Sequence, residues 1–85
     1  MRVIIVGPTQ SGKTTLLHKI IRMNPTLTFQ ILLDGFEALA QAGNDILANL
    51  PPNASFIISA LTIEALPVHV RNGAIVLNAQ TIRAL

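Results

Sequence analysis

The residues best suited to chemistry lie near the start of the chain, between Gly7 and Thr14. They follow the pattern G-x-x-x-x-G-K-T, in which Gly7 and Gly12 leave room for the backbone to curl around a ligand. The backbone N–H groups of such a curl, together with the N-terminus of a following helix, attract an anionic phosphate. Lys13 would then reach the β- and γ-phosphates of a nucleotide, and the Thr14 hydroxyl would ligate Mg²⁺. The alternative is a glycine-rich turn that joins a strand to a helix and binds nothing.

Such a loop needs a strand before it and a helix after it, and the sequence predicts both. Residues 2–6 are apolar on both faces, which is typical of a central parallel strand. Residues 12–23 carry apolar side chains at helical spacing, and Asn24-Pro25 ends this helix. The candidate nucleotide-binding residues are those of the loop and the first helical turn: Gly7, Pro8, Thr9, Gln10, Ser11, Gly12, Lys13, Thr14 and Thr15.

A second strand is predicted to end at an acidic residue. The apolar run at residues 27–33 predicts that strand, and it ends directly at Asp34. A carboxylate there would hold Mg²⁺ directly or through water. Asp34 also fits an N-cap, with the acid Glu37 three residues later, and the two roles are compatible. The following helix is expected over residues 36–50, where Gly43 marks either a close approach or a break.

The second half of the chain predicts two more strands. Residues 54–60 form a buried strand and residues 74–78 a last one, with a helical or irregular link at 61–66. Asn72-Gly73 would permit a tight hairpin between β-forming runs. We prefer a loop with Arg71 exposed, followed by a parallel strand beside residues 2–6. The remaining residues, 79–85, are expected to form a final helical turn.

Alternating strands and helices predict an α/β fold: a small, mainly parallel sheet of about four strands with helices on both faces, in three layers. The 85 residues form a single domain, 1–85. In such sheets the ligand lies at the carboxyl ends of the strands. The predicted loop and the predicted acid both fall at that edge.

Composition narrows the expected partners. Hydrophobic residues make up 51% of the chain and charged residues only 12%, so we expect an exposed apolar patch and self-association or a protein partner. The net charge of +2 is a weak argument for nucleic acid, because no cluster of Lys and Arg occurs. The chain has no Cys, which excludes disulfides and fits the cytoplasm. No apolar run approaches the roughly 18 residues of a membrane helix, so we expect no membrane association.

The segment GPTQSGKT, with a strand before it and a helix after it, resembles the Walker A motif of the P-loop NTPase superfamily. The resemblance covers residues 1–23 well and the rest loosely. It implies ATP and Mg²⁺ as ligands, with Thr14 and Asp34 holding the metal and Asp34 in the place of the Walker B carboxylate. A complete core of this superfamily is usually much longer, so the chain is a pared-down version or a fragment.

More detailed expectations come from the ASCE division of this superfamily. The resemblance implies the sheet order 74–78, 2–6, 55–60, 28–33. Ser59 matches the polar residue that faces the γ-phosphate in those proteins, and the alternative is a small residue at a strand end. Residues 57–77 are faintly similar to FtsK/HerA-type DNA-translocating ATPases. No N-K-x-D motif occurs, which argues against a GTPase.

The function expected from these residues is ATP-Mg²⁺ binding with weak or assembly-dependent hydrolysis. Lys13 would stabilise charge on the transferred phosphate. RecA-like and AAA-like ATPases often carry the catalytic Glu directly after the Walker B Asp, where this chain has Gly35. Glu37 is the nearest substitute and therefore the candidate catalytic carboxylate, and Arg71 or Arg83 of a neighbouring subunit could complete the site. The alternative is a non-catalytic interaction module that keeps the scaffold and joins a partner or a larger ATPase assembly.

Overall fold

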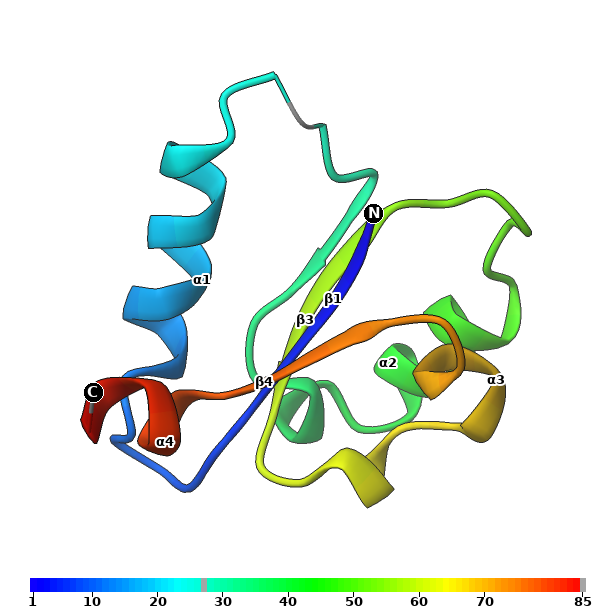
Figure 1. Cartoon of the computed structure of the whole chain (residues 1–85). Coiled ribbons are helices and arrows are strands. Elements are labelled where there is room, and N and C mark those ends of the chain that lie inside the picture. The colour runs from blue at the N-terminus through cyan, green and yellow to red at the C-terminus, as the bar shows by residue number, and fades with distance from the viewer. Residues whose placement is uncertain (27, 85) are drawn as a thin grey trace.

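A computed structural model of the chain describes residues 1–26 and 28–84, leaving out the side chains of residues 83 and 84 (Figure 1). In chain order, the elements are β1 (Arg2–Val6), α1 (Lys13–Met23), β2 (Ile31–Leu33), the 3₁₀ helix η1 (Phe36–Leu39), α2 (Gln41–Ala48), β3 (Phe56–Ala60), the 3₁₀ helix η2 (Ile63–Ala65), α3 (Val68–Arg71), β4 (Ile75–Asn78) and α4 (Ala79–Ala84). The four strands pair in parallel in the order β2-β3-β1-β4. Both the parallel α/β class and the expected strand order are confirmed.

The sheet separates two layers of helices. Figure 1 shows α1 along one face, with α4 beside its N-terminal end, and α2 and α3 grouped on the other face. Successive side chains of β1 point to opposite faces, so Val3 and Ile5 pack with Leu17 of α1, whereas Ile4 packs with Phe36. Leu17, Ile4 and Ile5 have no exposed surface, and each buried side chain of this size contributes about 1.5–3 kcal/mol. The three-layer arrangement therefore fixes β1 from both sides, and the loop that follows β1 starts from a rigid strand.

The second strand is shorter than predicted. The apolar run at residues 27–33 predicted a strand of that length, but β2 covers only Ile31–Leu33, and Leu27 lies outside the described residues. The backbone N–H groups of Gln30 and Ile31 both donate to the carbonyl oxygen of Ser55, at 3.1 and 3.2 Å. Two successive donors on one acceptor interrupt the regular ladder, so the strand begins only at Ile31.

The predicted helix over residues 36–50 is wrong as a single element. The chain forms η1, turns at Ala40 with a φ of 51°, and then forms α2, which ends at Ala48. This turn places the Phe36 ring against Gly43: a Cβ at Gly43 would lie 3.0 Å from Cε2 of Phe36. Gly43 therefore marks a close approach, and the break comes three residues earlier.

The connection to the last strand also differs in part. A loop with an exposed Arg71 was expected, but Pro67 starts the single turn of α3 and Arg71 is half-buried. Gly73, with a φ of 78°, then turns the chain into β4, which pairs in parallel with β1. The parallel strand beside β1 that was preferred to a hairpin is thus confirmed, whereas the exposed loop at Arg71 is not. Along the described residues, no helix is long and apolar enough to cross a membrane.

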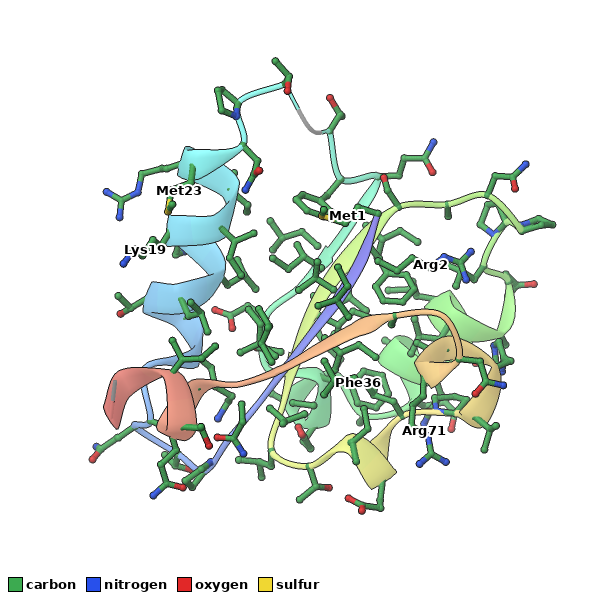
Figure 2. All side chains as sticks on the ribbon, viewed as in Figure 1. Met1, Arg2, Lys19, Met23, Phe36 and Arg71 are labelled. Atoms are coloured by element: carbon green, nitrogen blue, oxygen red, sulfur yellow. The ribbon has the colours of Figure 1, made fainter. Side chains whose placement is uncertain are left out.

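Arg2 closes the amino end of the sheet. Its Nε donates to the carbonyl oxygen of Ala54 at 2.8 Å, and its Nη2 donates to those of Pro51 and Pro52 at 3.2 and 2.8 Å. The guanidinium also lies over the Phe56 ring, 5.3 Å from the centroid. Figure 2 shows Arg2 at the loop between α2 and β3, at the end of β1 opposite the candidate loop.

Candidate functional site

The loop between β1 and α1 leaves the carboxyl end of β1 and turns back into the helix. The Gly7 N–H donates to the carbonyl oxygen of Ala60 at 3.2 Å, which continues the pairing of β1 with β3 by one residue. Gln10 and Gly12 both have left-handed backbone conformations, with φ of 63° and 89°. Turns that contain such residues can aim backbone N–H groups into one concavity, which is the geometry of anion-binding nests. The predicted loop therefore has a curled backbone at the N-terminus of α1.

Gly7 and Ser11 pack against each other across this curl. A Cβ at Gly7 would lie 2.6 Å from Oγ of Ser11, so the close approach requires glycine. Ser11 is only 7% exposed, and its hydroxyl has no hydrogen-bond partner within the described structure. Buried hydroxyls are usually paired, so the Ser11 hydroxyl is an exception within the described structure, and it lies at the tightest contact of the loop.

Lys13 folds back over the loop instead of extending into solvent. Its Nζ donates to the carbonyl oxygens of Gly7 and Pro8, at 2.7 and 3.0 Å. An ammonium group has three N–H donors, so these two bonds leave one donor for a ligand. The arrangement holds a positive charge beside the curl. Pro8 and Thr9 are exposed at the loop.

Thr14 and Asp34 meet although they are twenty positions apart in the sequence. The Thr14 hydroxyl donates to Oδ2 of Asp34 at 2.9 Å, which joins the first turn of α1 to the end of β2. Within residues 1–26 and 28–84 there is no cluster of three or more His, Cys, Asp or Glu side chains. The pair nonetheless fits Mg²⁺, because this ion prefers oxygen ligands and is commonly held by one or two carboxylates with waters and substrate phosphates.

Ser59, at the end of β3, completes a network around Asp34. Its hydroxyl donates to Oδ1 of Asp34 at 2.6 Å and accepts the Gly35 N–H at 2.7 Å. The proposed N-cap role of Asp34 is wrong, since η1 starts at Phe36 with Gly35 as its N-cap residue and without a side-chain cap. Both carboxylate oxygens of Asp34 instead bind hydroxyl groups of neighbouring elements.

The other candidate residues have different environments. Both carboxylate oxygens of Glu37 accept the Leu61 N–H, at 2.8 and 2.7 Å, which ties η1 to the chain after β3. Arg71 lies on α3, and its buried Nε has no partner within the described structure. The side chain of Arg83 lies outside the described part. The structure therefore brings together Lys13, Thr14 and Asp34, whereas Glu37 is engaged with backbone.

Two adjoining pockets lie at the loop. The smaller pocket, of about 180 Å³, is lined by Gln10, Gly12, Lys13, Thr14 and Thr15. The larger pocket, of about 590 Å³, is lined by Gln10, Ser11, Gly12, Thr15, Leu16, Lys19, Ala79 and Ile82. The two pockets share Gln10, Gly12 and Thr15, so they are neighbours, and we refer to them together as the hollow between the loop, α1 and α4.

Sequence reasoning missed the part of this hollow that α4 provides. Ala79 and Ile82 follow β4, and β4 lies next to β1, so their place beside the loop follows from the predicted strand order. Lys19 lies on the side of α1 away from the sheet, where Figure 2 shows it with Met23. Helical spacing alone gave no reason to connect Lys19 with a ligand.

Comparison of the chain with protein-family models, with curated proteins and with solved structures gave no match. The candidate site is therefore defined by its geometry alone.

Proposed function

We propose that this protein binds ATP together with Mg²⁺ at the loop between β1 and α1. The observation that carries the proposal is the convergence of Lys13, Thr14 and Asp34 at the carboxyl edge of a parallel sheet. An ammonium, a curl with two left-handed residues and a helix N-terminus all favour a polyphosphate at this place. The hydroxyl of Thr14 and the carboxylate of Asp34 suit the metal that accompanies such a ligand.

The adjoining pockets match the two parts of a nucleotide. The smaller pocket includes Lys13 and Thr14 and suits the phosphates. The larger one, about 590 Å³, lies within the 300–1,000 Å³ usual for small-molecule sites, and Leu16, Ala79 and Ile82 give it an apolar wall for a base. Gln10 and Thr15 line both pockets, so one ligand can extend from one to the other.

Each side chain of the loop would have a separate task in phosphoryl chemistry. Lys13 would place positive charge beside the oxygens that become more negative during transfer. Mg²⁺ supplies neutralisation of the phosphates when it is bound, and Thr14 and Asp34 would hold it. The exposed Thr14–Asp34 pair leaves this edge open to water and to a neighbouring subunit. An arginine of such a subunit, Arg71 or Arg83, would add charge in trans.

Hydrolysis is proposed to be slow, or to depend on assembly. Gly35 follows Asp34, and the Glu37 carboxylate accepts the Leu61 N–H with both oxygens. A carboxylate engaged in this way is poorly placed to orient an attacking water. We propose a cytoplasmic protein that binds nucleotide and hydrolyses it slowly.

A second candidate function is a non-catalytic interaction module that keeps this scaffold. Edge strand β4 favours it, because Ile75 and Val76 are 50% and 46% exposed on opposite faces of the strand. Exposed apolar side chains at a sheet edge are typical of surfaces that contact another chain. On this alternative, nucleotide would be a structural ligand or would be absent.

The test is nucleotide binding by isothermal titration calorimetry, with Lys13→Ala as the variant and Arg22→Ala as the matched control. Arg22 is an exposed cation in the last turn of the same helix, so its removal changes the net charge equally. We expect Lys13→Ala to weaken ATP binding at least tenfold, because a hydrogen bond to a charged group contributes about 1.5–3 kcal/mol. Arg22→Ala should stay within about twofold of the original protein.

The outcomes separate the two functions. Absence of ATP and GTP binding by the unmodified protein, or unchanged binding by Lys13→Ala, would refute a phosphate-binding loop. Binding that depends on Lys13 without turnover, with or without DNA, would favour the interaction module. Turnover per molecule that rises with protein concentration would favour a site shared between subunits.

A further inference from the structure

We propose that Ser59 is a positioning residue for the metal-binding edge: its hydroxyl fixes the Asp34 carboxylate and thereby sets how strongly Mg²⁺ enhances nucleotide binding. This inference depends on the proposed ATP-Mg²⁺ function and assigns Ser59 a role different from contact with the γ-phosphate. The hydroxyl acts on the metal site through Asp34 and does not touch the nucleotide.

The Ser59 hydroxyl is fully used by its two neighbours. A serine hydroxyl has one proton to donate, and here the proton goes to Oδ1 of Asp34 at 2.6 Å. A lone pair of the same oxygen accepts the Gly35 N–H at 2.7 Å. The hydroxyl is therefore held from both sides, and it has no second proton for a phosphate oxygen.

Strand β3, which carries Ser59, is buried at the centre of the sheet. Ser59 has no exposed surface and lies on β3, between β1 and β2, where it pairs in register with Ile5. Asp34 is exposed and follows the three-residue edge strand β2. A group on a buried central strand thus restrains a carboxylate on an exposed edge.

The orientation of the Asp34 carboxylate depends on this restraint. The terminal torsion of an Asp side chain is broad, so an unrestrained carboxylate samples many orientations. The Ser59 contact on Oδ1 leaves Oδ2 directed at Thr14, the other expected metal ligand. Mg²⁺ requires close to ideal octahedral geometry, so loss of this orientation weakens the site. Removing a partner that orients a metal ligand typically costs about 10–100-fold in metal affinity.

The test compares Ser59→Ala with Ser55→Ala. Ser55 precedes the other end of β3, and its hydroxyl donates to the carbonyl oxygen of Thr28 at 2.8 Å, so the control removes an equivalent hydroxyl far from the loop. ATP affinity is measured by calorimetry in EDTA and at increasing Mg²⁺ concentration. We expect Ser59→Ala to raise the Mg²⁺ concentration for half-maximal enhancement at least tenfold, with ATP affinity in EDTA unchanged. Ser55→Ala should leave both quantities unchanged.

A second variant, with a weaker hydrogen bond to Asp34, keeps the test valid if Ser59→Ala does not fold. Ser59→Cys keeps a side chain of similar shape with a weaker S–H donor, so it should give a smaller shift in the same direction. Equal Mg²⁺ dependence in the Ser59 and Ser55 variants would overturn the inference while leaving ATP binding established. An equal loss of ATP affinity with and without Mg²⁺ would also overturn it. Failure of the unmodified protein to bind ATP would instead refute the proposed function itself.

Discussion

Alanine at Gly12 should damage the loop through backbone strain alone. Gly12 has φ and ψ of 89° and 20°, in the left-handed region. A Cβ built there meets no atom within 4 Å, so the substitution creates no clash beyond its chain neighbours. Gly73 offers a matched control, because it has a φ of 78°, an equally open Cβ position and a place in the turn before β4.

The expected magnitude follows from these two facts. A residue with a Cβ in the left-handed region costs about 1–2 kcal/mol. Alanine also restricts the unfolded chain, which offsets about 0.4–1 kcal/mol, so Gly73→Ala should lose about 1 kcal/mol of unfolding free energy. In a domain of this size that loss lowers Tm by about 4–8 °C. Gly12→Ala should lose less than this, because its loop can relax when no ligand is bound.

Ligand binding should distinguish the two positions. In Gly12→Ala the loop can relax to a negative φ, and binding must then restore the strained conformation at a cost of about 1–2 kcal/mol. At 1.4 kcal/mol per tenfold change, ATP affinity should fall about 5–30-fold. Gly73→Ala should bind ATP as the unmodified protein does.

The assays are thermal unfolding followed by circular dichroism and ATP titration by calorimetry. A Tm loss in Gly12→Ala no larger than that in Gly73→Ala, with selective loss of ATP binding in Gly12→Ala, would support the loop geometry. Undiminished ATP affinity in Gly12→Ala would show that binding does not use this backbone conformation. An equal loss in Gly73→Ala would show that the effect is one of general stability.

Two further predictions concern contacts outside the loop. Glu37→Gln should change the unfolding free energy by less than about 1 kcal/mol and leave ATP turnover unchanged, because the amide oxygen can still accept the Leu61 N–H. Loss of turnover, measured as phosphate release, would instead identify Glu37 as the catalytic carboxylate. Arg2→Ala should lose about 2–3 kcal/mol in urea unfolding, since bonds to the Ala54 and Pro52 carbonyls and the contact with Phe56 all disappear. ATP affinity of the folded Arg2→Ala protein should be unchanged, and a change would show that the two ends of β1 are coupled.

Local patterns indicated the strands and the loop of the candidate site, whereas the expected strand order came from the resemblance to the ASCE division. The apolar residues of β1 and the glycines of the loop indicated a strand, a turn and a helix in one place, and the structure has them there. An apolar run that ends at Asp34 predicted that this carboxylate reaches the loop, and it binds the Thr14 hydroxyl. These features follow from periodicity and from residue types that fit one conformation.

Other features depend on contacts between distant residues, which periodicity does not contain. The start of β2 is decided by the carbonyl oxygen of Ser55, 24 residues after Ile31. The turn at Ala40 has no local signal, because alanine does not favour a positive φ. Glu37 was expected one turn into a helix, yet η1 directs it to Leu61.

Met1 and the C-terminal helix α4 lie at different distances from the hollow. Met1 lies at the amino end of the strand, and the five residues of β1 span about 16 Å from there to the loop. The C-terminal helix α4 lies beside the start of α1 (Figure 1). Its residues Ala79 and Ile82 line the larger pocket. A dye, an affinity tag or a surface tether is therefore best fused ahead of Met1, where it leaves the hollow open.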